Sequence, residues 1–184
     1  YVTIGACLIA RDEEHNIIRA LKPLAKRVKT IWVGDTGSKD STKEFAARYA
    51  TVVDVSSPLT AGFDQSRNEI LEVMVENEDL DWVLWMDCDE CGVDLHKLRR
   101  YINRGDLGIY EGFVLQQVHA MIDMAPTPDI PIRLFKNRDY YRFYGRIHEH
   151  AMSLKDDLDG NTPIFPVLIL SDTKFAHYGY TTEL

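Results

Sequence analysis

The sequence has few cysteines, a shortage of positive charge and no long apolar run, and each shortage excludes a class of protein. Its three cysteines cannot all pair within the chain, so reduced thiols and a cytoplasmic location are expected. Lysine and arginine number 21 against 29 aspartates and glutamates, and the net charge of −8 disfavours a nucleic-acid binder. The apolar run at residues 164–170 is too short to span a membrane and is interrupted by Pro166.

The chain also lacks repeats, low-complexity tracts and a clear linker, which favours a single domain. Its 184 residues, 45% of them hydrophobic and 27% charged, fit one globular domain. No signal peptide is expected, because Tyr1 leads directly into a strand-like segment. The missing initiator methionine and the abrupt end at Leu184 predict a trimmed chain or the front part of a longer protein.

Apolar and amphipathic segments alternate through the first half, which predicts an α/β fold. Strands are expected at residues 2–10, 30–33, 52–55 and 82–86, and helices at 17–28, from 41 onward and at 63–75. Pro23 is expected to kink or end the first helix. Ser41 and Glu44 are expected to form a capping box. Strands that alternate with helices predict a parallel sheet with helices on both faces.

The pattern changes after about residue 105. Strand-like segments at 113–118, 131–135 and 140–144 follow one another without long helices between them. We therefore expect one domain, 1–184, in which an α/β half, 1–105, is followed by a mixed α+β half, 106–184. The second half is expected to pack on the end of the same sheet.

Two carboxylates follow the fourth expected strand at a spacing that suits a metal ion. In an extended chain Asp87 and Asp89 share a face, with Cα atoms roughly 6.7 Å apart. At about 7 Å they repel by roughly 2 kcal/mol at an effective dielectric of about 20, and Glu90 and Asp94 add negative charge. A divalent cation that prefers oxygen ligands relieves this repulsion. The alternative is a solvated acidic turn.

The position of this carboxylate pair favours a binding site. The segments that begin at Arg11, Asp35 and Asp87 each follow an expected strand. In a parallel sheet these segments open on the same edge, where ligands of α/β proteins gather.

Cys88 and Cys91 form a CxxC pair beside these acids. Neighbouring carboxylates raise thiol pKa values, which disfavours a redox role. No second CxxC pair is present to complete a zinc site. We therefore interpret the two cysteines as incidental thiols.

Seven segments resemble, in the same order, motifs of family 2 glycosyltransferases. They are CLIARDEEHNI at 7–17, DTGSKDST at 35–42, SRN at 66–68, DCDE at 87–90, RLFKN at 133–137, IHE at 147–149 and HYGY at 177–180. The last three look like landmarks of a bacterial and phage branch. The resemblance implies a GT-A fold, a nucleotide-sugar donor and a divalent metal ion. It also implies that 1–105 binds the nucleotide sugar and that 106–184 binds the acceptor and completes the metal site.

The resemblance carries roles onto particular residues of this chain. In its DxD motif, Asp87 leans toward the ribose and the metal, and Asp89 grips the metal, which is Mn²⁺ or Mg²⁺. His177 is the third candidate ligand, because it follows a strand-like run and precedes Gly179; a packed histidine is the alternative. The residues expected to bind the nucleotide sugar are Ala10, Arg11, Glu13, Asp35, Gly37, Ser38, Arg67, Asp87 and Cys88.

The chemistry of three of these positions agrees with the resemblance. Asp35, at a strand end, can accept a hydrogen bond from a nucleobase or ribose. Asp12 or Glu13 can line the same pocket, or serve only as acids at a helix start. Arg67 can bind phosphate in a bidentate way or form a structural ion pair with a carboxylate.

The catalytic base is expected at Glu149. Inverting sugar transfer needs a carboxylate near the acceptor hydroxyl, and the ED pair usual in the family has no clear counterpart here. The alternative for Glu149 is an ion pair with Arg142 or Arg146, and Asp123 and Asp129 are weaker candidates for the base. The flanking histidines, His148 and His150, give only a weak signal for a separate zinc site.

We therefore predict a metal-dependent, inverting glycosyltransferase of hexosyltransferase type. It is expected to move a sugar from UDP-glucose or UDP-N-acetylglucosamine to an acceptor hydroxyl of unknown kind. Two alternatives stay open: an inactive nucleotide-sugar-binding module, and a metal-dependent phosphoesterase or nucleotidyl transferase that uses the same acids.

Overall fold

The computed structural model describes residues 2–104, 109–119, 132–138, 141–146, 150–153 and 167–177. Residues 116–119, 150–153 and 167–177 are described by their backbone alone. The helices of the described part are α1 Ile17–Leu21, α2 Thr42–Ala46, α3 Pro58–Ala61, α4 Phe63–Asn77 and α5 Leu95–Asn103. The strands are β1 Ile4–Ala10, β2 Thr30–Asp35, β3 Thr51–Asp54, β4 Trp82–Trp85, β5 Glu90–Cys91, β6 Gly112–His119, β7 Ile132–Lys136, β8 Tyr141–Tyr144, β9 His150–Ser153 and β10 Val167–His177.

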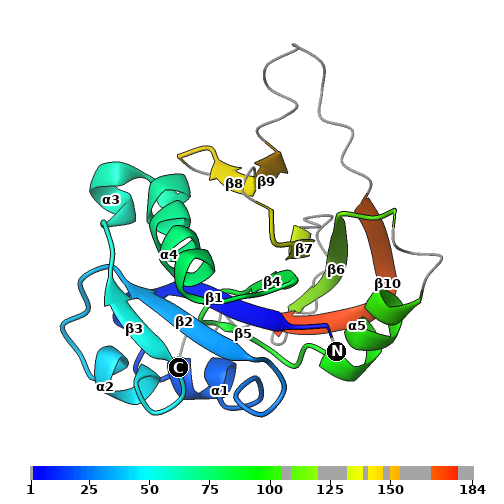
Figure 1. The fold of residues 1–184 in the computed structure, drawn as a ribbon. Coiled ribbons are helices and arrows are strands. Elements are labelled where there is room, and N and C mark those ends of the chain that lie inside the picture. The colour runs from blue at the N-terminus through cyan, green and yellow to red at the C-terminus, as the bar shows by residue number, and fades with distance from the viewer. Residues whose placement is uncertain are drawn as a thin grey trace.

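Eight strands form one mixed sheet in the order β3-β2-β1-β4-β7-β6-β10-β5, which Figure 1 shows at the centre of the molecule. The first four strands of this order, β3 to β4, pair in parallel. β7 runs antiparallel between β4 and β6, and β5 pairs antiparallel with β10. β8 and β9 form a separate antiparallel pair. The prediction of a parallel α/β half followed by a mixed half on the same sheet is therefore confirmed.

Two apolar cores cover the two faces of the sheet. Along β1, Ile4 and Leu8 pack into the core that includes α1 and α5, while Cys7 packs into the core that includes α4. Figure 1 shows α1, α2 and α5 below the sheet and α3 and α4 above it. Gly34 of β2 lets α4 approach closely, since a Cβ there would lie 3.1 Å from the Cβ of Ile70.

The capping box expected at the start of α2 is wrong. The Ser41 side chain makes no capping hydrogen bond, and the Asp40 carboxylate instead accepts from the amide of Thr42 at 3.0 Å. The amide of Ser41 donates to the carboxylate of Glu14, in the loop after β1. Glu44 pairs with an arginine one helical turn further on. Asp40 thus accepts at the start of α2 in place of the Ser41 side chain, and Glu14 of the neighbouring loop binds the Ser41 amide in place of Glu44.

Three further features complete the fold. α1 ends at Leu21, before Pro23, as expected. α5 was not expected from the sequence; Asp94 caps it by accepting from the amide of Lys97 at 3.0 Å. Among the described residues, no helix is both long enough and apolar enough to cross a membrane.

Candidate functional site

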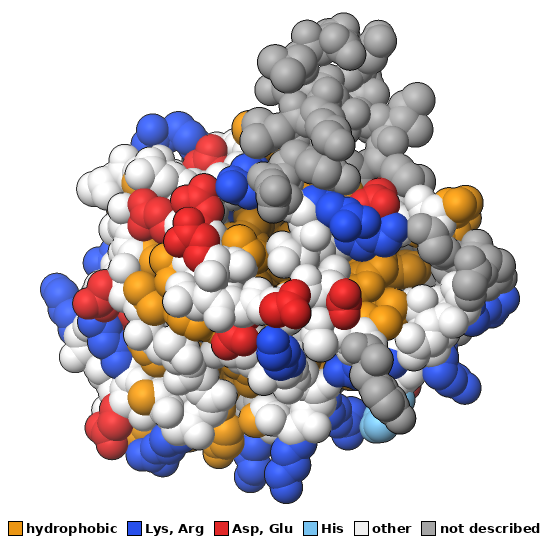
Figure 2. Space-filling model, viewed as in Figure 1, with side chains coloured by type: hydrophobic (Ala, Val, Ile, Leu, Met, Phe, Trp, Pro, Cys, Tyr) orange, Lys and Arg blue, Asp and Glu red, His pale blue; other side chains and the backbone are white. Residues whose placement is uncertain are grey.

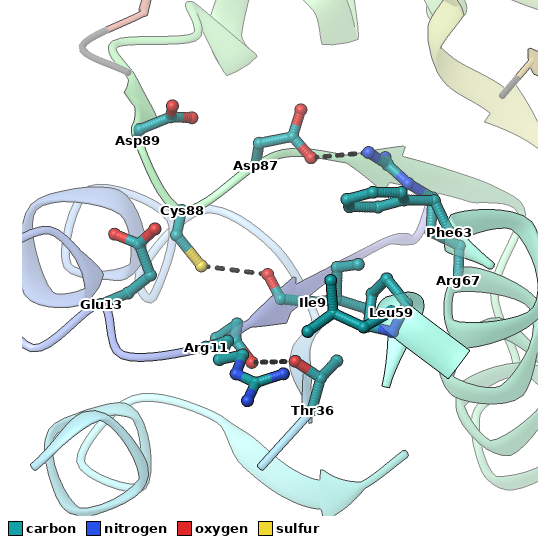
Figure 3. Close-up of a pocket in the computed structure, with 12 residues that line it drawn as sticks. Ile9, Arg11, Glu13, Thr36, Leu59, Phe63, Arg67, Asp87, Cys88 and Asp89 are labelled. Carbon is teal, nitrogen blue, oxygen red and sulfur yellow. Dashed lines mark hydrogen bonds and ion pairs between the residues drawn. The ribbon is translucent and has the colours of Figure 1, made fainter. Parts of the chain in front are cut away.

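A cavity of about 410 Å³ lies at the carboxyl edge of the parallel strands. It is open to solvent and is bounded by the loops that follow β1, β2 and β4 and by the start of α3 and α4, as Figure 3 shows. Its lining consists of Ile9, Ala10, Arg11, Glu13, Thr36, Pro58, Leu59, Phe63, Arg67, Asp87, Cys88 and Asp89. The segments at residues 11, 35 and 87 thus meet at one edge, as predicted.

Asp87 is held in this cavity by two arginines. Its Oδ1 lies 3.1 Å from Nη2 of Arg67, and its Oδ2 accepts from Nη2 of Arg133 at 3.0 Å. Burial disfavours the charged carboxylate, but the two guanidinium groups outweigh burial and hold the pKa of Asp87 well below its usual range. Asp87 is therefore ionised at neutral pH.

Arg67 is itself fixed by aromatic rings. Its guanidinium carbon lies 4.7 Å from the ring centre of Trp85 and 5.5 Å from that of Phe143. The next residue on α4, Asn68, donates to the carbonyl of Phe143 at 2.9 Å and accepts from its amide at 2.8 Å. This fastens β8 to α4. Arg67 thus forms the ion pair considered as its alternative role, and it also lines the cavity.

A buried acid lies behind Asp87. The Glu90 side chain is 1% exposed, forms an ion pair with Arg133, and accepts from the amide of Asp87 at 2.9 Å. Burial raises the pKa of Glu90 to about 8; the charge of Asp87 adds to this, and Arg133 acts against it. Arg67, Asp87, Arg133 and Glu90 therefore form one continuous network of polar contacts, in which Glu90 is mostly protonated at neutral pH.

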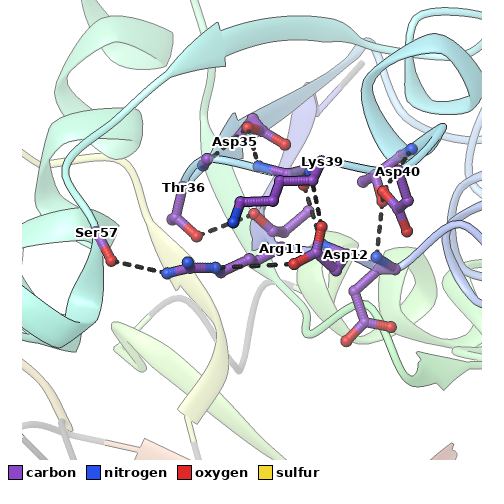
Figure 4. Close-up of polar contacts among 12 residues, drawn as sticks. Arg11, Asp12, Asp35, Thr36, Lys39, Asp40 and Ser57 are labelled. Atoms are coloured by element: carbon purple, nitrogen blue, oxygen red, sulfur yellow. Dashed lines mark hydrogen bonds and ion pairs between the residues drawn. The ribbon is translucent and has the colours of Figure 1, made fainter.

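The loops after β1 and β2 are joined by hydrogen bonds, which Figure 4 shows. The amide of Asp12 donates to Oγ of Ser38 at 3.0 Å, and the amide of Lys39 donates to Oδ1 of Asp12 at 2.7 Å. The amide of Glu14 donates to Asp40. Asp12 has a φ of 52°, in the left-handed region that aspartate tolerates better than most residues. The two loops therefore form one wall, and Asp12 organises it.

Asp35 lies next to this wall and is not part of the cavity lining. Its Oδ1 accepts from the amides of Gly37 and Ser38, both at 2.9 Å, and lies 3.6 Å from Nζ of Lys43. Its Oδ2 is buried without a hydrogen-bond partner. Thr36 lines the cavity, whereas Asp35 and Gly37 on either side of it do not. The structure thus shows Asp35 shaping the loop, and its contact with a nucleotide stays a prediction.

Arg11 and Glu13, two further residues expected to bind the nucleotide sugar, both line the cavity and are held by neighbouring side chains. Nη1 of Arg11 donates to Oγ of Ser57 at 3.1 Å, which ties the first loop to α3. Glu13 is half-buried, and burial raises its pKa; a hydrogen bond from Asn16 opposes this, and the charge of Asp89 adds to it. Asp89 therefore lies close enough to disfavour the charge of Glu13.

The cysteines behave as incidental thiols. All three are free, and Cys88 donates from Sγ to the carbonyl of Ile9 at 3.1 Å. Burial, followed by the charges of Glu13 and Asp87, raises the pKa of the Cys88 thiol well above its usual range. A reactive thiolate at this position is therefore disfavoured, as expected.

The expected metal ligands converge only in part within the described residues. Asp87 and Asp89 both line the cavity. The backbone of His177 pairs with that of Glu90 in the β5–β10 ladder, which places His177 one residue from Asp89 in register. Among the residues whose side chains are described, no group of three acids, histidines or cysteines could hold a metal ion.

The expected base lies outside the described residues. This holds for Glu149, and also for His148, Asp123 and Asp129. His150 belongs to β9, where the backbone alone is described.

Sequence reasoning missed three contributors to the site. It quoted Arg133 as part of a motif but gave it no role; an arginine inside an apolar strand was the available signal. It also missed Leu59 and Phe63, which are 80% and 40% exposed and line the cavity from the side of α3 and α4. No periodic signal marked them, because they lie around the break between two helices.

Comparisons with known proteins agree with this geometry. A family model described as glycosyl transferase family 2 matches residues 6–148. A TPR repeat-containing protein of Synechococcus elongatus is 26% identical over 177 residues, which cover 96% of this chain and 42% of that protein. The chain therefore spans less than half of this relative.

Two solved structures share the fold. The crystal structure of S. aureus TarS matches with a TM-score of 0.62 at 15% identity, over 96% of this chain and 37% of that one. The structure of S. aureus TarS 1–349 in complex with UDP-GlcNAc matches with a TM-score of 0.63 at 14% identity, over 99% of this chain and 60% of that one. The fold expected from the motifs is thereby confirmed.

Proposed function

The chain belongs to glycosyl transferase family 2 and has the GT-A fold, and from this premise we propose how it works. It transfers a sugar from a uridine diphosphate sugar to an acceptor hydroxyl, with inversion at the anomeric carbon and with the help of a divalent metal ion. The observation that carries this proposal is the cavity at the carboxyl edge, where Asp87 and Asp89 meet a fixed arginine.

The charges of the cavity support a metal ion. Glu13, Asp87 and Asp89 line it together with Arg11 and Arg67, and the charge of Arg67 is already engaged by Asp87. A diphosphate adds negative charge to this acidic lining. A divalent cation would make such a ligand compatible with the site.

The residues present fit Mn²⁺ or Mg²⁺. Carboxylate oxygens suit both ions, and an imidazole from His177 would favour Mn²⁺. Each oxygen of Asp87 accepts from one arginine, which leaves lone pairs for a further contact. Asp89 and His177 would be the principal ligands and Asp87 would lean toward the ribose. The bound ion would neutralise the leaving diphosphate.

The wall made by the first two loops is the proposed nucleoside site. Ala10, Arg11 and Thr36 line the cavity there, and Gly37 and Ser38 support it through their bonds to Asp35. The buried Oδ2 of Asp35 is an unused acceptor beside this wall. The TarS structure with UDP-GlcNAc supports a UDP-sugar, and UDP-N-acetylglucosamine and UDP-glucose are the proposed donors.

The roles of the two halves of the chain and its location in the cell are also proposals. We assign 1–105 to donor binding and 106–184 to the acceptor and to completion of the metal site. The free thiols support a cytoplasmic location.

Calorimetry tests the role of the metal ion. UDP is expected to bind at least about tenfold more tightly with Mn²⁺ than with a chelator, which is about 1.4 kcal/mol, because the ion offsets repulsion from Asp87 and Asp89. Uridine, which lacks phosphate, serves as the control and should show no such dependence. Equal affinities of UDP in the two conditions would exclude a metal bridge.

Glu149→Gln tests the proposed base. The amide is nearly isosteric but cannot take the acceptor's proton, so turnover should fall by at least ~10² while donor affinity stays within a few fold. Glu76→Gln, on the exposed surface of α4, is the matched control and should leave both unchanged. If Glu149→Gln instead loses donor binding, the base must be sought at Asp123 or Asp129.

The products separate the two alternatives. Release of inorganic phosphate without sugar transfer would identify a phosphoesterase. Metal-dependent binding of UDP-sugar without any turnover would identify an inactive binding module.

A further inference from the structure

Two segments of this acidic chain carry positive charge alone. Residues 15–29 contain five lysines and arginines, residues 95–104 contain four, and neither segment contains an aspartate or glutamate. Together they hold nine of the 21 basic residues of a chain with a net charge of −8. If the two segments lie side by side in the fold, they form a single basic surface.

The structure brings the two segments together. The guanidinium of Arg99, on α5, donates to the carbonyl of Arg27 at 2.9 Å and to that of Val2 at 2.7 Å. Leu21 of α1 and Leu98 of α5 belong to the same apolar core. We call the surface over α1, α5 and the turns after α1 the basic face. Its principal cations are Lys22, Lys26, Arg27, Lys97, Arg100 and Arg104.

Four of these cations form no ion pair within the described part of the chain. They are Lys22, Lys26, Arg27 and Arg100, and all four are exposed. Cations elsewhere pair with acids, as Lys136 does with Glu111 at 2.7 Å. Figure 2 shows lysine and arginine gathered along the lower edge of the molecule, where Figure 1 places α1 and α5.

We propose that the basic face docks the protein on an anionic lipid surface. Lysine and arginine that face such a surface gain binding free energy roughly in proportion to their number. The same layer of helices also contains α2 with the exposed Glu44, and Asp94 caps α5, so the contact with a planar membrane would be made by α1, the turns after it and the exposed cations of α5.

Nucleic acid suits this surface less well. Binding of single strands relies on exposed aromatic rings for stacking, and Tyr101 of α5 is instead partly buried against the core, which leaves His96 as the exposed ring of this helix. A polymer that bends around the molecule would also meet its excess of acids. The cavity for the donor lies at the carboxyl edge of the sheet, apart from the basic face, so docking would leave it open.

Vesicle sedimentation of the 184-residue chain tests the proposal. It should bind vesicles of phosphatidylcholine with about 30% phosphatidylglycerol, and not vesicles of phosphatidylcholine alone. Binding should be lost at ~1 M salt, where the screening length is about 3 Å. Equal binding to both kinds of vesicle overturns the proposal, and so does tighter binding to a single-stranded oligonucleotide than to the anionic vesicles.

Charge reversal locates the surface. Lys26→Glu with Arg100→Glu should weaken vesicle binding by at least about 20-fold, since each cation contributes a factor of about five. Arg138→Glu with Arg146→Glu changes the net charge equally at exposed sites elsewhere and should alter binding by no more than about twofold. Circular dichroism checks that both variants are folded. If both variants weaken vesicle binding equally, net charge alone governs binding, and the proposal that the basic face is the membrane-binding surface is wrong.

Discussion

Asp89→Asn is expected to lower sugar transfer by ~10³-fold or more while leaving the protein folded. The carboxylate is proposed as a principal metal ligand, and loss of about 4 kcal/mol of charge stabilisation in the transition state corresponds to ~10³ in rate. Asparagine keeps the size of the side chain but supplies a neutral ligand. Turnover of a UDP-sugar in Mn²⁺ and the thermal unfolding midpoint are the two measurements.

Stability should survive this change because Asp89 lies among other acids. Its charge contributes to the raised pKa values of Glu13 and Glu90, so removing it relieves repulsion. Asp79→Asn is the matched control: it makes the same chemical change at an exposed position before β4. Unchanged turnover in Asp89→Asn would show that the DxD match is accidental.

The fold was predictable because burial leaves a direct trace in the sequence. β1 is buried on both faces, so it appears in the sequence as a continuous apolar run. The apolar residues of α4 recur at the spacing of a helix with one apolar side. The meeting of Arg11, Asp87 and Asp89 at one cavity also follows from strand direction alone.

The remainder depends on contacts between distant segments, which local patterns do not encode. The sequence around Ser41 matches a capping box, but the Ser41 amide donates its hydrogen bond to Glu14, which is distant in sequence. Asp35 lies at a strand end, where ligand-binding residues are expected, yet its Oδ1 accepts hydrogen bonds from the amides of its own loop. The pairing of Arg133 with Asp87 joins β7 to the end of β4, two strands that are neighbours in the sheet but are separated in sequence by β5, α5 and β6.

Arg133→Met is expected to destabilise the protein by about 3–5 kcal/mol. Its side chain is 8% exposed and that of Glu90 is 1% exposed, so the substitution leaves a buried carboxylate without its cation. Asp87 keeps Arg67 and loses less. Urea unfolding at pH 8 measures the loss. Lys136→Met, on the same strand, is the control: Glu111 is 23% exposed and retains Arg138, so a loss of about 1 kcal/mol or less is expected.

The pH dependence of stability isolates the part of that loss that comes from the charge of Glu90. A carboxyl group whose folded pKa is raised binds more protons in the folded than in the unfolded state, so it lowers stability as pH rises from its unfolded pKa through its folded pKa. For Glu90 this window runs from 4.5 to about 8 in the native protein. Without Arg133 the folded pKa of Glu90 rises further, so the two proteins differ through Glu90 only above about pH 8, where the native carboxyl group ionises and that of the variant does not. Arg133→Met should therefore lose more stability at pH 9.5 than at pH 6, and adding Glu90→Gln should abolish this difference. A loss that is equal at both pH values would assign the role of Arg133 to packing and to its pair with Asp87 instead.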